Sequence, residues 1–243
     1  MRPSTILVWR GLSTYNDEPI EVTLTGLRRR SSNIKTNDMA QVWIQASASE
    51  PHVAALNGDE LAACGSCPLT CGRGCYVVRH QAPLAVHRWA RRHNAKPNLL
   101  GACEAIATVS KPTRFGAFGD VGYLPRNVSE PLLSSAQHKG WTCYSQTWRD
   151  PENAWLSRYA MASCYGRTEA AVARSLGWLP FVVTADSDPV KGCRPCPTMR
   201  GASCDRCLGC SGTEGGRGHG FYLPAHGASA AKVRRLVVLT ESL

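Results

Sequence analysis

Strand-like and helix-like segments alternate through most of the second half of this 243-residue chain. The strand-like segments are 113–118, 141–145, 159–163 and 178–184, and the helix-like segments between them are 125–138 and 167–176. Strand, crossover helix and strand in units of about 30 residues form parallel connections. We therefore expect an α/β fold, either a partial (β/α) barrel or an open parallel sheet.

The segments outside this region are less regular. We expect residues 1–32 to form an N-terminal β-hairpin with a basic connector, and residues 33–243 to form an α/β domain that carries the cysteines. The hairpin strands are predicted at 5–9 and 20–25. Further predictions are a strand at 41–45, helices at 50–56, 83–93 and 97–109, and strands at 220–223 and 236–240.

Nine of the 12 cysteines lie in two glycine-rich loops more than a hundred residues apart. The first loop contains Cys64, Cys67, Cys71 and Cys75, and the second contains Cys193, Cys196, Cys204, Cys207 and Cys210. A C-x2-C pair on a tight turn points both thiols the same way, which suits one ion or cluster. Because both loops are predicted to follow strands, we expect them on the same rim of the sheet.

Three interpretations of these cysteines remain open. The pairs Cys193/Cys196 and Cys204/Cys207 have the spacing of a structural zinc site. The triplet Cys204, Cys207 and Cys210 has the spacing of ferredoxin-type iron–sulfur loops, with Cys196 as the fourth ligand. Disulfides or unliganded thiols are the third interpretation. We favour iron–sulfur, with Cys71 and Cys193 as additional candidate ligands.

The net charge is +10, from 28 Lys and Arg against 18 Asp and Glu. This charge favours polyanions, nucleic acid first, although the basic clusters can equally form a solvated surface. No apolar run approaches the roughly 20 residues that span a bilayer, so no membrane partner is expected. Met1–Arg10 contains only four consecutive apolar residues, which is not typical of a secretory signal. We expect a cytoplasmic protein, where thiols serve metals or catalysis.

Several blocks of the chain resemble a cysteine-rich protein family of bacteriophages and actinobacterial genomes. The resemblance runs from about residue 31 to 228, and its cysteine blocks are specific. The family brings no assigned activity with it. If the chain is phage-encoded, the resemblance implies the cytoplasm of the host cell. The matching blocks are Asn33–Ile44, Cys64–Leu69, Gly74–Val77, Gly116–Asp120, Cys196–Pro197, Cys204–Cys210 and Pro224–Gly227.

A more distant resemblance connects the chain with radical S-adenosylmethionine enzymes. A cysteine loop that ends in Cys75-Tyr76 is followed by a strand that ends in Gly119-Asp120. In those enzymes a partial barrel carries a cubane cluster after its first strand, and an acidic glycine-rich turn after the second meets the amino group of the cofactor. The spacing departs from their C-x3-C-x2-C, because this loop reads C-x2-C-x3-C-x3-C.

The resemblance implies a division of labour among the cysteines. Cys64, Cys67 and Cys75 would hold a reactive cluster, while Gly119 and Asp120 would orient S-adenosylmethionine. A second, auxiliary cluster would be held by the later cysteines: Cys196, Cys204, Cys207 and Cys210. The leading hypothesis is thus an iron–sulfur protein, radical S-adenosylmethionine-like in its chemistry, of unknown substrate. The alternative is a zinc-stabilised nucleic-acid-binding protein that acts in phage replication or host takeover.

Overall fold

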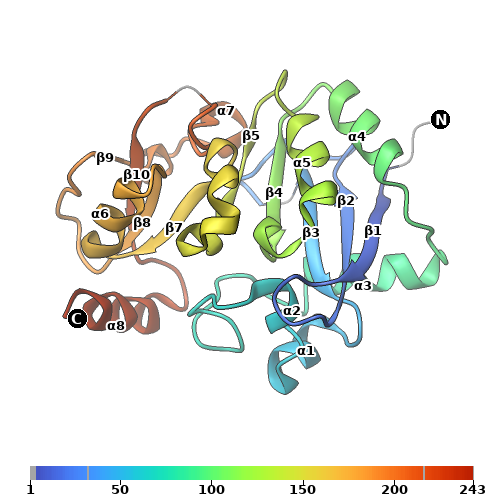
Figure 1. Cartoon of the computed structure of the whole chain (residues 1–243), viewed down its shortest axis with the longest axis horizontal. Helices are drawn as coiled ribbons and strands as arrows, with labels where there is room; N and C mark the ends of the chain where they lie inside the picture. Colours follow the sequence, from blue (N-terminus) through green and yellow to red (C-terminus); the bar gives the residue numbers. More distant parts are fainter. Residues whose placement is uncertain (1–3, 32, 216, 243) are drawn as a thin grey trace.

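A computed structural model describes residues 4–31, 33–215 and 217–242 and contains two five-stranded sheets (Figure 1). The first sheet is mixed, with strand order β1-β2-β3-β4-β5. The second is entirely parallel, with order β6-β7-β8-β10-β9. Helices cover both sheets, which makes this an α/β protein.

The first sheet begins with an antiparallel hairpin. Strand β1 (Ile6–Leu12) pairs with β2 (Pro19–Thr25), and β2 pairs with β3 (Ala40–Ala46) over six residues from Ile20↔Ala46 to Thr25↔Gln41. The N-terminal hairpin is therefore built into the same sheet as the first parallel strands. β4 (Thr113–Phe118) and β5 (Trp141–Thr142) then add in parallel.

The second sheet follows directly from the first. Only Cys143 separates β5 from β6 (Tyr144–Ser145). The Cys143 N–H donates to the carbonyl oxygen of Cys210, and its own carbonyl oxygen accepts from the Met161 N–H. Residues 141–145, predicted as one strand, thus serve as an edge of both sheets. The remaining strands are β7 (Met161–Tyr165), β8 (Pro180–Thr184), β9 (Cys193–Pro195) and β10 (Gly220–Pro224).

The described helices lie between successive strands, except α8, which follows β10. The α-helices are α1 (Pro51–Asn57), α2 (Leu61–Cys64), α3 (Ala82–Arg92), α4 (Leu99–Thr108), α5 (Arg126–Ser134), α6 (Arg167–Ser175), α7 (Cys204–Cys207) and α8 (Ala230–Glu241). Four 3₁₀ segments complete the fold: η1 (Val121–Tyr123), η2 (Thr147–Arg149), η3 (Pro151–Arg158) and η4 (Pro197–Arg200). Within the described residues, every helix is too short or too polar to span a lipid bilayer.

One apolar core extends across both sheets. Its members alternate along the strands, because every second strand side chain points to the helix-covered face. Phe115 of β4 and Val182 of β8 belong to this core, and Trp148 of η2 is among its largest fully buried side chains. The opposite side chains of the same strands face a cavity, described below.

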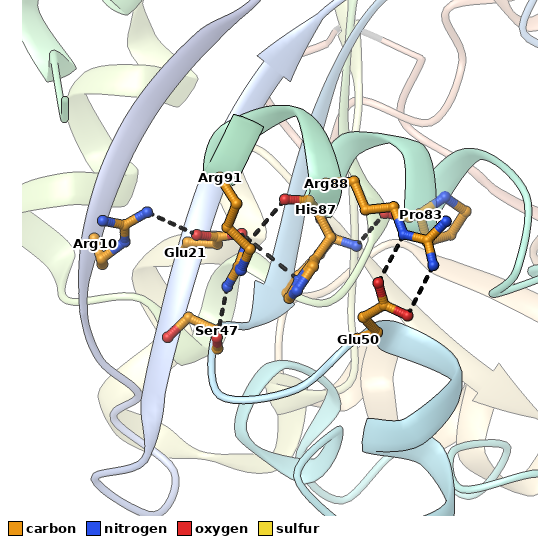
Figure 2. Close-up of polar contacts among 9 residues, drawn as sticks. Arg10, Glu21, Ser47, Glu50, Pro83, His87, Arg88 and Arg91 are labelled. Atoms are coloured by element: carbon orange, nitrogen blue, oxygen red, sulfur yellow. Dashed lines mark hydrogen bonds and ion pairs between the residues drawn. The ribbon is translucent and has the colours of Figure 1, made fainter. Parts of the chain in front are cut away.

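A buried charge network fastens α3 to the first sheet (Figure 2). Glu21 of β2 has no solvent exposure. Its carboxylate accepts hydrogen bonds from Arg10 Nη2 at 3.2 Å and Arg91 Nη1 at 2.7 Å, and His87 Nδ1 lies 3.8 Å away. A buried carboxylate needs such partners because its desolvation is costly. The network therefore holds the C-terminal half of α3 against β2.

Two predicted elements differ from the structure. Residues 236–240, predicted as a strand, lie in α8, where Val233 and Val237 are buried one helical turn apart against Leu69 and Tyr165. Helix α5 ends at Ser134 rather than 138, and the Ser135 hydroxyl donates to the Leu132 carbonyl oxygen at 2.6 Å. Such a side-chain hydrogen bond to the backbone competes with the hydrogen bonds that would continue the helix.

Candidate functional site

A cavity of about 850 Å³ lies against the inner face of both sheets. Its walls come from alternate residues of successive parallel strands, the face opposite to the core. Both cysteine loops also reach it, as do the segment 33–36 and the start of α8. The alternating strand residues that line the cavity are Arg114, Gly116, Thr142, Tyr144, Ser163, Tyr165, Phe181, Val183, Phe221 and Leu223, and Ala117, Phe118 and Cys164 also reach it.

The first thiol group consists of Cys64, Cys67 and Cys75, and all three line this cavity. Burial raises the pKa of the Cys64 thiol, and the charges of Glu60, Cys67 and Cys75 raise it further. Burial likewise raises the pKa of Cys67 to about 11, with contributions from Cys75 and Asp120. The three thiols are thus close enough for their charges to interact, and a cation placed between them would favour the thiolates.

A buried ion pair organises the first loop. Glu60, with 1% exposure, accepts from Arg79 Nε at 2.7 Å and Arg79 Nη2 at 2.8 Å. The middle of the loop is fixed by the Cys71 N–H, which donates to Glu60 Oε2 at 2.9 Å. The Cys71 thiol itself is not among the cavity-lining groups, and it accepts from the Thr70 hydroxyl. Cys71 therefore shapes the loop through its backbone and lies apart from the other three.

Tyrosines connect this loop to the ends of the strands. The Ser66 N–H donates to the Tyr123 hydroxyl at 3.1 Å. The Tyr165 hydroxyl lies 4.0 Å from Cys67 Sγ and accepts from Gln146 Nε2 at 2.9 Å. The loop is therefore held at the carboxyl ends of β4, β6 and β7.

Gly119 and Asp120 directly follow β4 and lie beside the first thiol group. The Asp120 carboxylate is buried, and its two oxygens accept from the N–H groups of Gly122 and Gln146. These bonds tie the turn after β4 to the turn after β6. Gly119 has φ +77°, and a Cβ there would lie 2.3 Å from the Ile44 carbonyl oxygen. The turn thus lies directly against β3, and only glycine fits at this position.

The second thiol group consists of Cys196, Cys204, Cys207 and Cys210, which also line the cavity. Burial raises the pKa of Cys210, and the charges of Cys196, Cys204 and Cys207 add to this effect. The four thiols come from the end of β9, from α7 and from the turn after it.

Cys193 lies outside this group. Its sulfur accepts from Arg174 Nη1 at 3.7 Å, and it sits on β9 rather than on the cavity wall. Cys103, Cys143 and Cys164 pack in or against the core, as expected for small apolar side chains.

The expectation that both loops occupy one rim is wrong. After Cys196 the second loop crosses the inner face toward the amino ends of the strands. The Cys204 N–H donates to the carbonyl oxygen of Lys35, which precedes β3, and the Cys210 carbonyl oxygen accepts from Cys143. A Cβ at Gly140, just before β5, would lie 2.8 Å from Leu208. The cause is the long connection between β9 and β10, which has room to fold back into the cavity.

Arg114 and Tyr76 connect the two thiol groups. Arg114 Nη2 donates to the Tyr76 hydroxyl at 2.9 Å, and Tyr76 follows Cys75 directly. Burial lowers the pKa of Arg114, but Tyr76, Tyr144, Cys204 and Cys210 raise it, and the net shift is upward. Sequence reasoning missed Arg114. A cation inside the otherwise apolar strand 113–118 was the available signal.

Among the described residues, no group of three or more Cys, His, Asp or Glu side chains could hold a single metal ion. No family model, curated protein or solved structure matches this chain.

Proposed function

We propose that this chain is an iron–sulfur protein with a partial (β/α) barrel and radical S-adenosylmethionine-like chemistry. The observation that carries the proposal is that two separate thiol groups, of three and four cysteines, line one cavity. Cavities of this size, about 850 Å³, accommodate small-molecule ligands and cofactors.

The strand order supports the barrel. Six strand positions run parallel and follow the chain: β3, β4, β5/β6, β7, β8 and β10. Side chains of all of these positions except β3 line the same cavity. In a flat sheet with helices on both faces, a helix would fill that space. A curved sheet around an open interior accounts for both features.

In the described part of the chain, the thiols are not gathered as closely as a single zinc ion requires. A zinc ion holds its sulfurs about 3.8 Å apart, as a tetrahedron with Zn–S bonds of about 2.3 Å requires. No such single-ion group exists among the residues that the structure describes. A cubane of four irons is wider than one ion and needs its ligand sulfurs further apart.

The proposed roles follow from position. Cys64, Cys67 and Cys75 would hold the cluster at the carboxyl ends of the strands, and three ligands leave one iron open. Such a cluster, once bound and reduced by an external one-electron donor, would supply the electron that splits a sulfonium. Both Asp120 oxygens are already engaged with backbone N–H groups. We therefore expect Asp120 to hold the turn in place, while the backbone of Gly119 lies beside the cofactor's amino end.

Counting iron and sulfide after anaerobic purification tests this proposal. We expect about eight irons per chain, in two cubanes. Cys75→Ala removes one cluster and spares the other, and Cys207→Ala does the reverse, as followed by visible absorption and electron paramagnetic resonance. The matched controls Cys71→Ala and Cys193→Ala keep both clusters, because their thiols lie outside the two groups.

The proposal also predicts cleavage of S-adenosylmethionine by the reduced protein. Cleavage is lost in Cys75→Ala and retained in Cys71→Ala. Colourless protein with stoichiometric zinc, or loss of both clusters in each single variant, would contradict the two-cluster assignment.

A further inference from the structure

Among the described residues, the mouth of the cavity is basic and has no matching acid. Lys35, before β3, lines the opening, and Arg73 in the first cysteine loop and Lys232 in α8 are exposed directly beside the lining residues Gly74 and Val233. Lys35 Nζ lies 2.6 Å from His226 Nε2, and Lys232 Nζ donates to the Gly72 carbonyl oxygen at 3.4 Å. In the described part of the chain, none of the three cations has a carboxylate within ion-pair distance.

The interior does not neutralise this charge. The one acidic side chain on the described cavity wall is Asp120, and both its oxygens accept from backbone N–H groups. The cations therefore present positive charge to solvent at separate points around the opening. Separated cations of this kind favour an extended polyanion, whose successive charges can each meet one of them. A small anion would be bound better by cations that converge in a deep pocket.

An aromatic ring is fixed at the same opening. Tyr76 is 69% exposed, and its hydroxyl accepts from Arg114 Nη2 inside the cavity. Ile34, 88% exposed, also lines the opening. The exposed Tyr76 ring is available for stacking, because the hydrogen bond from Arg114 already fixes its orientation. Bases stack on such rings regardless of sequence.

We propose that the mouth binds single-stranded nucleic acid, with backbone phosphates on Lys35, Arg73 and Lys232 and a base stacked on Tyr76. The base would thereby be presented to the cavity, since chemistry on a base requires that it leave the helical stack. This inference rests on the proposed function in taking the cavity as the reaction site. The net charge of +10 is consistent with such a partner.

Fluorescence anisotropy with labelled DNA and RNA strands of about 12 nucleotides tests the proposal on cluster-loaded protein. Three phosphate contacts on a single strand predict a slope of about −2 for log affinity against log salt. Lys35→Gln, Arg73→Gln and Lys232→Gln each reduce the slope by about 0.7. Tyr76→Ala weakens binding about fivefold or more without changing the slope, and Tyr76→Phe restores most of it.

Lys96→Gln is the matched control, because this exposed lysine lies between α3 and α4, next to β1 at the far edge of the first sheet. It should leave affinity and slope unchanged. Equal effects of Lys96→Gln and the mouth variants would overturn the proposal, as would equal binding of a duplex of the same sequence. Iron content is measured in every variant. Absent binding with full iron overturns this inference alone, whereas binding by iron-free, colourless protein counts against the proposed function.

Discussion

Single residues show how narrowly the site is built. Gly119 has a left-handed backbone and lies against the carbonyl oxygen of Ile44, so it places the turn after β4 close to β3. Asp120 then connects this turn with the turn after β6 through two backbone hydrogen bonds. The turn that the sequence motif pointed to is thus held by contacts across three strands, not by the motif alone.

Gly119→Ala should destabilise the protein by about 3 kcal/mol. The left-handed backbone costs about 1 kcal/mol, and the clash with Ile44 adds to it. Gly177→Ala is the matched control, because Gly177 has φ +81° but no atom within 4 Å of its added Cβ. It should cost only about 1 kcal/mol. Urea unfolding measures both, and equal losses would show that the close approach to Ile44 carries no energetic weight.

At the scale of elements, the packing of α3 against β2 depends on the protonation state of His87. His87 is buried between Glu21, Arg91, Glu50 and Arg88, and burial together with the charge of Arg91 lowers its pKa to about 4. An unfolded histidine titrates near 6.5. Below that pH the unfolded chain takes up a proton that the folded chain refuses, so the free energy of unfolding falls as the pH drops from about 6.5 to 4.

The loss attributable to His87 amounts to up to about 3 kcal/mol. We therefore expect His87→Gln to unfold with a weaker pH dependence between pH 7 and 5 than the unmodified protein. His138→Gln, at an exposed histidine, should leave the dependence unchanged. Thermal unfolding at several pH values provides the comparison, and parallel curves for His87→Gln and the unmodified protein would refute this role.

At the scale of the whole molecule, the sheets and the cysteine loops rely on different sources of stability. The two sheets share one apolar core, and the first sheet is held further by the Glu21 network. The cysteine loops contain little regular structure beyond α2, α7 and a few 3₁₀ turns, and they pack around the cavity. A bound cluster would stabilise these loops directly, because ligand binding to the folded state adds to its stability.

Removal of iron by chelation under oxidation should therefore lower Tm by at least about 5 °C. Limited proteolysis should then cut within residues 64–80 and 196–210, while the strands of the first sheet stay protected. Circular dichroism and mass spectrometry of the fragments give both readouts. Identical melting and cleavage with and without iron would mean that the loops fold independently of any cluster.

Local pattern was sufficient for most elements because each carries its own periodicity. β4 is found at the predicted residues 113–118, and α1, α3, α4 and α6 lie within two residues of their predicted ends. The grouping of the thiols also follows from short spacings. The strand prediction at 236–240 failed since Leu236-Val-Val-Leu239 suits either structure, and only the packing of Val233 and Val237 against Leu69 and Tyr165 selects helix.

The sequence by itself determined the α/β class, the two cysteine groups and the glycine turn, because these depend on residues near one another in the chain. The tertiary structure alone decided that β5 and β6 divide between two sheets, that the second loop folds into the cavity, and that Arg114 meets Tyr76. Each of these rests on partners that are distant in sequence, such as Cys143 with Cys210 and Lys35 with Cys204. No local pattern encodes such pairings, since they form only when the sheets and their connecting loops pack against one another.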